Sequence, residues 1–217
     1  MAFEVKKEYK DLYQPATTPS IIEVPRMRFV AVEGSGDPNE EGGDYQTALQ
    51  LLYGVSFTIK MSRKSKDPAD HIEGYYDYVV PPLEGLWHMD AAGDNGTIDY
   101  SRKMDFQWTS MIRLPEFVTD EAFDACVTRF AAKHPEADTS RVFLLDWTEG
   151  LVGQIMHKGP YDNEPTTIAT LDQHIAESGH RLDFDLANRR LHHEIYLGDP
   201  CKSKPENLRT VIRHPIA

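Results

Sequence analysis

Two stretches of the 217-residue sequence decide the fold: FVAVEGSGDP at residues 29–38 and QIMHKGPYD at residues 154–162. Each begins with apolar residues typical of a strand and ends in a loop that contains glycine and proline. Each is followed by a helical pattern and then by two strand patterns. The sequence therefore contains a strand–helix–strand–strand unit twice, as a repeat of pattern and not of residue identity.

A unit of this kind covers one face of its sheet with its helix and leaves the other face bare. Two such units bury their bare faces by pairing about a pseudo-twofold axis. We therefore predict an α+β fold in which two modules, at about residues 21–117 and 118–217, place antiparallel sheets around a central cleft. Residues 1–20 are expected to be a lead-in segment, and residues 1–217 to be a single domain.

In the first module, the alternation of side chains predicts a strand over residues 27–32, followed by a glycine-rich loop over residues 33–43. Apolar residues spaced by three and four predict a helix over residues 44–61. Two further strands are predicted over residues 76–80 and 105–113.

The second module is expected to begin with a helix over residues 119–134, with Thr119 as its N-cap. Two short strands then meet in a turn at Glu149 and Gly150. A third helix is opened by Pro165 and closed by Gly179. The strands of this module are predicted over residues 142–146, 150–157, 192–197 and 209–214.

The segment HHEIYLGDP at residues 192–200 carries the main candidate site. Alternate side chains of a strand point to opposite faces, so His192, Glu194 and Tyr196 share one face. That face is polar and aromatic, as expected of a cleft lining, although Glu194 alone would also suit an exposed edge strand. The opposite, mostly apolar face, which we expect to contact the covering helix, consists of His193, Ile195 and Leu197.

Aromatic residues form the second candidate feature. Phe106 and Trp108 alternate onto one face of a predicted strand, and Trp87 lies close to the same sheet. Two indoles in one module favour a flat aromatic ligand over a purely structural role. His157 and Tyr161 flank the turn that leads into the third helix, where they either face the cleft or serve the turn itself.

Composition excludes several other classes of protein. The formal net charge of −12 and the scattered basic residues argue against a nucleic-acid partner. No apolar run approaches the ~20 residues that a membrane span needs, and two cysteines without a CxxC spacing favour the reducing cytoplasm. The adjacent His192 and His193 point opposite ways on a strand, so no metal site is predicted, and no motif indicates a cofactor.

Four segments resemble the GyrI-like small-molecule-binding proteins, and the resemblance runs from about residue 27 to residue 217. The chain is similar to the stand-alone members, because residues 1–26 are too short and too acidic for a helix-turn-helix. One departure is His88 after Trp87, where relatives are expected to carry a second aromatic residue. The segments are YVVPPLEGLW (78–87), MDFQWTSMIRLPEFVT (104–119), GLVGQIMHKGPYDNEPTTIATLDQHI (150–175) and HHEIYLGDPCKSKPENLRTVIRHPI (192–216).

The resemblance implies a carboxylate among aromatic rings that receives bulky aromatic or cationic xenobiotic-like molecules and so protects the cell. Glu194 would be that carboxylate, with Tyr196 beside it. The alternative that the resemblance implies is a hydrolase of cyclopropane-bearing DNA-alkylating compounds, in which Glu194 activates water and Tyr196 hydrogen-bonds the substrate or the water. A haem-binding adaptor of similar architecture lacks a histidine in an axial-ligand context. The expected partner is a small molecule, and the chain is expected to be a monomer or a weak homodimer.

Overall fold

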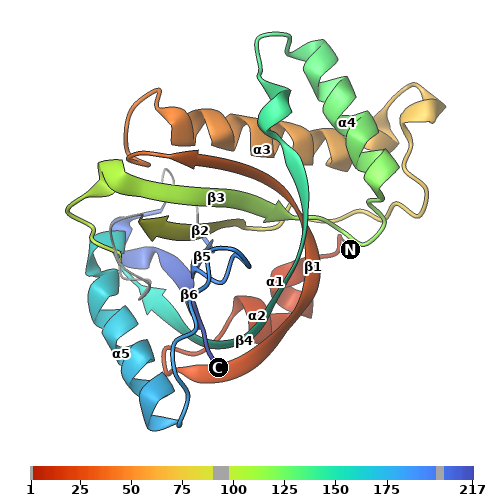
Figure 1. Cartoon of the computed structure of the whole chain (residues 1–217). Helices are drawn as coiled ribbons and strands as arrows, with labels where there is room; N and C mark the ends of the chain where they lie inside the picture. Colours follow the sequence, from red (N-terminus) through yellow and green to blue (C-terminus); the bar gives the residue numbers. More distant parts are fainter. Residues whose placement is uncertain (1, 90–97, 199–202) are drawn as a thin grey trace.

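In the computed structural model, which describes residues 2–89, 98–198 and 203–217, six strands close into an antiparallel barrel in the order β1-β3-β2-β5-β6-β4 (Figure 1). Within these described residues, no helix is both long enough and apolar enough to cross a membrane. The strands are β1 Ser20–Ser35, β2 Leu83–Met89, β3 Phe106–Arg113, β4 Phe143–Lys158, β5 His192–Tyr196 and β6 Arg209–Pro215.

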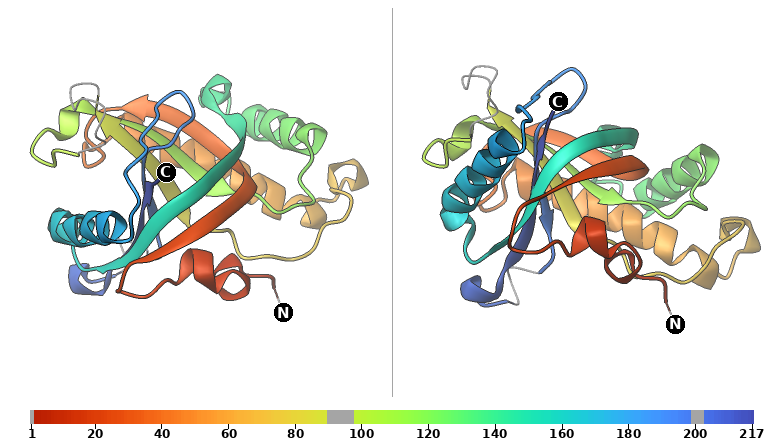
Figure 2. Two further views of the ribbon diagram at one scale, coloured as in Figure 1. Left: turned by 60° about the horizontal axis from the view of Figure 1, so that its bottom comes forward. Right: turned by 90° about the horizontal axis from the view of Figure 1, so that it is seen from below.

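The helices lie outside the barrel wall or at one end of it. α3 and α4 pack against each other on the side formed by β1 and β3, and α5 lies along β4 (Figures 1 and 2). The short α1 and α2 lie beside the barrel near the N-terminus, and their apolar side chains join the interior core. The bounds are α1 Val5–Glu8, α2 Lys10–Tyr13, α3 Asp44–Lys60, α4 Asp120–Lys133 and α5 Glu164–Glu177.

The predicted fold class is confirmed, because the element order contains the strand–helix–strand–strand unit twice. The first unit is β1-α3-β2-β3, the second is β4-α5-β5-β6, and α4 separates them in the chain. The three longer helices occur where the apolar spacing predicts them. Thr119 caps α4 as expected, because its hydroxyl accepts a hydrogen bond from the backbone N–H of Ala122 at 3.2 Å.

The predicted strand over residues 76–80 was wrong. In that segment only Tyr78 forms a bridge, with Phe3, and the strand of this unit begins later, at Leu83. Pro81 and Pro82 lie between, and a proline has no N–H to donate to a strand ladder. Tyr78 is buried against Phe117, which explains its apolar environment without a strand.

The predicted turn at Glu149 and Gly150 was also wrong. β4 passes through both residues without reversing, and Gly150 has a φ of 76°. This left-handed conformation is one that glycine adopts readily, and here it bends the strand. The paired β1 is correspondingly longer than expected and starts inside the predicted lead-in segment, at Ser20.

The two faces of the barrel wall have separate cores. Phe29 and Ala31 point inward with Ile195, whereas their neighbours Val30 and Val32 pack outward against α3. A third cluster forms between the wall and α5, where Ile155 and Ile212 meet Leu171 and Ile175. The expectation that the Ile195 face contacts the covering helix was therefore wrong: it packs inside the barrel. Cys126 lies on the buried face of α4, and Cys201 lies outside the described residues.

Candidate functional site

Glu194 is the centre of the candidate site. The residue is 7% exposed, and both carboxylate oxygens have partners on the same strand face. His192 Nε2 lies 2.9 Å from Oε1, and the Tyr196 hydroxyl donates to Oε2 at 2.7 Å. The alternation of β5 thus brings together the three residues that the sequence places on one face.

Trp87 holds the hydroxyl of Tyr196 in place. Its indole Nε1–H donates to Tyr196 Oη at 2.9 Å from the neighbouring strand β2. Gly85, which pairs with Glu194, leaves room for the indole: a Cβ at this position would lie 2.6 Å from Trp87 Nε1. The glycine is needed here for close approach.

A ring cluster surrounds this pair. Trp87 lies 5.8 Å from Phe106 and 5.6 Å from Tyr45 of α3, measured between ring centroids. Tyr45 also meets Trp108 edge-on at 5.1 Å, and on the other side Tyr161 meets Tyr196 at 5.8 Å. The structure therefore brings Phe106, Trp87, Trp108 and Tyr161 into one aromatic cluster with Tyr196. Tyr45 was missed as a site residue, because its spacing in the sequence is that of an ordinary buried helix face.

Glu164 is a second carboxylate at the same place, and sequence reasoning missed it too. It is the first residue of α5, is fully buried, and accepts a hydrogen bond from the Tyr100 hydroxyl at 3.1 Å. Its other oxygen, Oε1, has no hydrogen-bond partner among the described residues. A glutamate at the start of a helix is usually exposed and favoured there by the helix dipole. The only indication in the sequence that Glu164 belongs to the site was its position directly after the GPYDN turn.

The environment shifts the pKa values of the two carboxyl groups in opposite directions. Burial and the neighbouring charge of Glu194 raise the pKa of Glu164 well above its usual range. Burial opposes ionisation of Glu194 as well, but the hydrogen bond and charge of His192, together with the Tyr196 hydroxyl, lower the pKa of Glu194. Glu194 therefore favours the ionised form, whereas Glu164 favours the protonated form.

The predicted site residue His157, and His88, which departs from the family pattern, have different surroundings. His157 contacts the turn before α5, with Nδ1 2.8 Å from Thr167 Oγ1 and Nε2 3.1 Å from the Pro160 carbonyl oxygen. It serves the turn rather than the Glu194 cluster. His88 alternates with Trp87 on β2 and therefore points to the opposite face, so its departure from the family pattern does not change the ring cluster.

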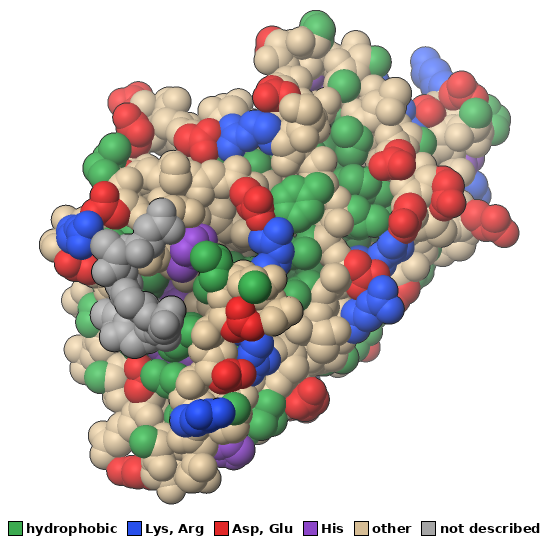
Figure 3. All heavy atoms as spheres, in the orientation of Figure 1, with side chains coloured by type: hydrophobic (Ala, Val, Ile, Leu, Met, Phe, Trp, Pro, Cys, Tyr) green, Lys and Arg blue, Asp and Glu red, His purple; other side chains and the backbone are tan. Residues whose placement is uncertain are grey.

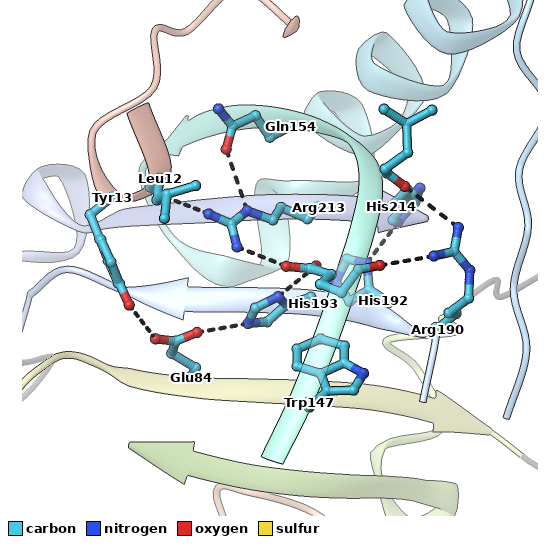
Figure 4. A network of polar contacts seen from close by, with 12 residues as sticks. Leu12, Tyr13, Glu84, Trp147, Gln154, Arg190, His192, His193, Arg213 and His214 are labelled. Atoms are coloured by element: carbon cyan, nitrogen blue, oxygen red, sulfur yellow. Dashed lines mark hydrogen bonds and ion pairs between the residues drawn. The ribbon is translucent and has the colours of Figure 1, made fainter. Parts of the chain in front are cut away.

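The interior face of β5 carries a buried polar network at His193 beside the apolar contacts of Ile195. His193 is fully buried, with Nδ1 2.8 Å from Glu149 Oε1 and Nε2 3.1 Å from Glu84 Oε2 (Figure 4). Arg213 donates to the second oxygen of Glu149 at 2.8 Å, and Tyr13 donates to Glu84 at 3.1 Å. The network joins β2, β4, β5 and β6 to α2, so it holds the barrel and the N-terminal helices together.

Among the described residues, no grouping of three histidine, cysteine, aspartate or glutamate side chains suits a metal ion. The candidate site instead combines two buried carboxyl groups, whose pKa values are shifted in opposite directions, with several aromatic rings on the outer side of the barrel wall. Such a combination suits a small-molecule site better than a macromolecular interface.

The fold and this site define a class, the duplicated α+β barrels that bind small molecules. The chain belongs to the GyrI-like family, since the family described as "GyrI-like small molecule binding domain" matches residues 17–217. A comparison with curated proteins gave no match.

Solved structures from Listeria innocua are similar over the whole chain. One, described as a hydrolase, is 40% identical, covers 99% of this chain and 100% of its own, and has a TM-score of 0.85. Another, described as an uncharacterized conserved protein, is 41% identical with the same coverage and a TM-score of 0.88. A third, also described as a hydrolase, is 39% identical, covers 100% of both chains and has a TM-score of 0.86.

Proposed function

We propose that this protein hydrolyses bulky aromatic electrophiles, with cyclopropane-bearing DNA-alkylating compounds as the substrate class. The observation that carries the proposal is the pair of adjacent buried carboxyl groups whose pKa values are moved apart, Glu194 downward and Glu164 upward. Pairs of this kind divide the roles of base and acid in enzymes. The description of two similar proteins from Listeria innocua as hydrolases adds support.

Glu194 is the general base in this mechanism. Its ionised carboxylate takes a proton from a water molecule, and the water oxygen attacks a ring carbon of the cyclopropane. The carbon–carbon bond of the ring breaks, and its electron pair moves to the carbonyl group conjugated with the ring. Glu164 then gives its proton to that carbonyl oxygen, so the net reaction adds one water molecule.

The aromatic cluster provides recognition. The rings from α3, β2 and β3 are buried against one another, whereas Tyr161 and Tyr196 at the edge of the cluster are partly exposed. A flat polycyclic compound would stack at this edge. Burial of both carboxyl groups among these rings lowers the local dielectric constant, which strengthens their electrostatic effect. Tyr196 orients Glu194, because its hydroxyl donates to the carboxylate while accepting from Trp87.

A protective binding protein for cationic or aromatic xenobiotics is the second candidate. The family description and the position of a carboxylate beside aromatic rings favour it, since each cation–π contact contributes about 0.5–2 kcal/mol. The hydrogen bonds argue against a cation as the main ligand. Both oxygens of Glu194 already have partners within the protein, and one of these is His192.

Mass spectrometry separates the two candidates. A cyclopropane-bearing alkylator is incubated with a catalytic amount of the wild-type protein, and the products are compared with those of a protein-free control. Hydrolysis predicts that the compound gains one water molecule over many turnovers. Recovery of unchanged compound that still binds the protein would contradict hydrolysis and support the binding protein.

A further inference from the structure

Glu164 receives a hydrogen bond from a residue of the first module. The hydroxyl of Tyr100, in the segment of residues 98–105 that precedes β3, donates to Glu164 Oε2 at 3.1 Å. The Tyr100 ring is half-buried and meets the ring of Phe106 edge-on, with 6.2 Å between the ring centroids. Tyr100 therefore links the aromatic cluster to the general acid of the proposed mechanism.

The direction of this hydrogen bond decides which oxygen of Glu164 carries the acidic proton. Burial and the charges of Glu194 and Glu164 raise the pKa of Tyr100 above its usual value of 10, so the phenol keeps its proton at neutral pH. Because this proton is donated to Oε2, Oε2 is the accepting oxygen of the carboxyl group. In a protonated carboxyl group the better acceptor is the carbonyl oxygen, and the proton is on the other oxygen. The acidic proton of Glu164 therefore belongs on Oε1.

The surroundings of Oε1 suit a proton at this position. Glu164 is fully buried, and Oε1 has no hydrogen-bond partner among the described residues. The Glu194 carboxylate and the Thr210 hydroxyl lie beside the Glu164 carboxyl group, since both influence its pKa. Thr210 is also fully buried, pairs with Tyr196 across β5 and β6, and its hydroxyl has no partner in the described part of the chain. A proton on Oε1 has acceptors in both groups, whereas a proton on Oε2 would leave Oε1 buried without a donor.

We propose that Tyr100 is a positioning residue for the general acid: its hydrogen bond to Oε2 holds the Glu164 proton on Oε1 and stabilises the carboxylate that remains when the proton has left. This inference rests on the proposed hydrolase function and adds one residue to it. In the reaction, Oε1 gives its proton to the carbonyl oxygen conjugated with the opening ring, Glu164 becomes a carboxylate, and Tyr100 keeps its own proton. Tyr100 thus acts through Glu164 and not on the substrate.

The same hydrogen bond makes Glu164 a stronger acid. Burial and the charge of Glu194 raise the pKa of Glu164, while the hydroxyls of Tyr100 and Thr210 oppose this rise because they donate to the charged form. An acid with a very high pKa transfers its proton to a substrate less readily. The other titratable groups that face this carboxyl group are Glu194 and Tyr196 on β5, and Asp162, in the turn before α5, faces Tyr100.

An infrared titration without substrate tests this assignment. The wild-type protein should show the carbonyl band of a protonated carboxyl group well above pH 4.5, the usual pKa of a glutamate, and Glu164→Gln should lack this band. Tyr100→Phe removes one donor and keeps the ring. In this variant the band should persist to a pH about one unit higher or more, because the charged form loses a hydrogen bond.

The position of the band reports which oxygen accepts the hydrogen bond. A hydrogen bond to a carbonyl oxygen polarises and weakens its bond to carbon, so the band should move to higher wavenumber in Tyr100→Phe. A band with the wild-type position and titration in Tyr100→Phe would contradict the proposal. So would the absence of a Glu164 band from the wild-type protein, which is measured independently of how well the Tyr100 variant folds.

A charge-neutral double variant is the matched control. Lys103 Nζ lies 3.2 Å from Asp162 Oδ1, and this ion pair joins the same segment to the same turn without involving Glu164. Lys103→Gln/Asp162→Asn removes the ion pair and leaves the net charge unchanged, so the infrared band should titrate as in wild type. An equal shift in this control and in Tyr100→Phe would show that attachment of the segment sets the pKa of Glu164, and would overturn the proposal. Melting temperatures report folding of each variant.

Kinetics test the role in catalysis. With a cyclopropane-bearing alkylator as substrate, Tyr100→Phe should lower kcat about tenfold or more, keep KM within about twofold and move the basic limb of the pH profile to higher pH. A loss confined to KM, or a lower kcat with an unshifted basic limb, would indicate a structural role and overturn the proposal. Absence of turnover in the wild-type protein would instead contradict the proposed function, while the infrared titration still decides whether Tyr100 positions the Glu164 proton.

Discussion

At the residue scale, the site depends on two glutamates with different surroundings. Glu194 lies between His192 and Tyr196, which favour its ionised form. Glu164 is buried beside a negative charge, and both effects disfavour its ionised form. Sequence alternation alone could place Glu194 with its partners, because a strand fixes which side chains share a face. It could not find Glu164, since the contact that matters spans from the start of α5 to β5.

The pH profile of hydrolysis should have two limbs. Glu194 must be ionised, so the rate falls as the pH drops through its lowered pKa. Glu164 must be protonated, so the rate also falls as the pH rises through its raised pKa. Glu164→Gln cannot supply the proton and should reduce turnover about 100-fold or more while binding is retained. Steady-state rates across the pH range check this, and a Glu164→Gln variant with wild-type rates would show that another group is the acid.

His193 should make stability depend on pH. Its charged partners Glu149 and Glu84 raise the pKa of His193 from 6.5 to about 9 against the opposing effect of burial. A raised pKa stabilises the fold below pH 6.5, and this contribution is lost as the pH rises from there through about 9. It is on the order of 3 kcal/mol.

Urea unfolding of wild type and His193→Gln at several pH values measures this contribution. The stability difference between them should shrink as the pH rises. On the acid side, His193 and Arg213 lower the pKa of Glu149 from 4.5 to about 2, although burial opposes this, so its contribution is lost as the pH falls through that range. A difference that is constant with pH would show that folding does not shift the pKa of His193 and would contradict this prediction.

At the element scale, patterns of side-chain spacing predict the long helices well and the strands less well. The apolar residues of α3, α4 and α5 recur with the 3.6-residue period of a helix, which differs clearly from the two-residue period of a strand. The segment around Tyr78 has the side-chain alternation of a strand. However, Pro81 and Pro82 follow it, and they cannot donate backbone hydrogen bonds to a sheet. The sequence at Gly150 predicts a turn, because a glycine with positive φ can either reverse a strand or bend it. Here β1 pairs with β4 on both sides of Gly150, so the strand bends and continues.

Gly85→Ala should damage the site through one contact between neighbouring side chains. The added Cβ would lie 2.6 Å from Trp87 Nε1, so the indole must move away from the Tyr196 hydroxyl. We expect ligand affinity and turnover to fall together, with a change in tryptophan fluorescence. Trp87→Phe is the comparison variant, because it keeps an aromatic ring and removes the hydrogen bond together with part of the indole's bulk. Unchanged affinity in both variants would show that the Trp87–Tyr196 contact does not position the site.

At the scale of the whole molecule, the duplication explains where the site lies. Each module contributes one helix to the site, α3 from the first and α5 from the second. The closed barrel brings Tyr45 and Trp87 of the first module together with Glu164 and Glu194 of the second on its outer side. The pattern repeat in the sequence predicts two modules. It does not predict barrel closure or the packed interior, because these depend on which strands pair at the ends of each sheet.

The whole-molecule charge predicts that duplex DNA is not a partner. The net charge is −12, and lysine and arginine side chains lie among acidic ones on the face in Figure 3. Neutralising phosphates needs a basic surface, so no shift of duplex DNA is expected at submicromolar protein and about 150 mM salt. A clear gel shift under these conditions would contradict this prediction.

In the proposed hydrolase, every catalytic step begins with Glu194 as the general base. The direct test is Glu194→Gln, which keeps the shape of the side chain and removes its charge, measured for turnover of a cyclopropane-bearing alkylator and for binding of a neutral aromatic ligand. Melting temperature serves as the control for folding. We predict that turnover is lost, by about 100-fold or more, while the neutral ligand binds nearly as in wild type. Wild-type turnover in Glu194→Gln would contradict the account.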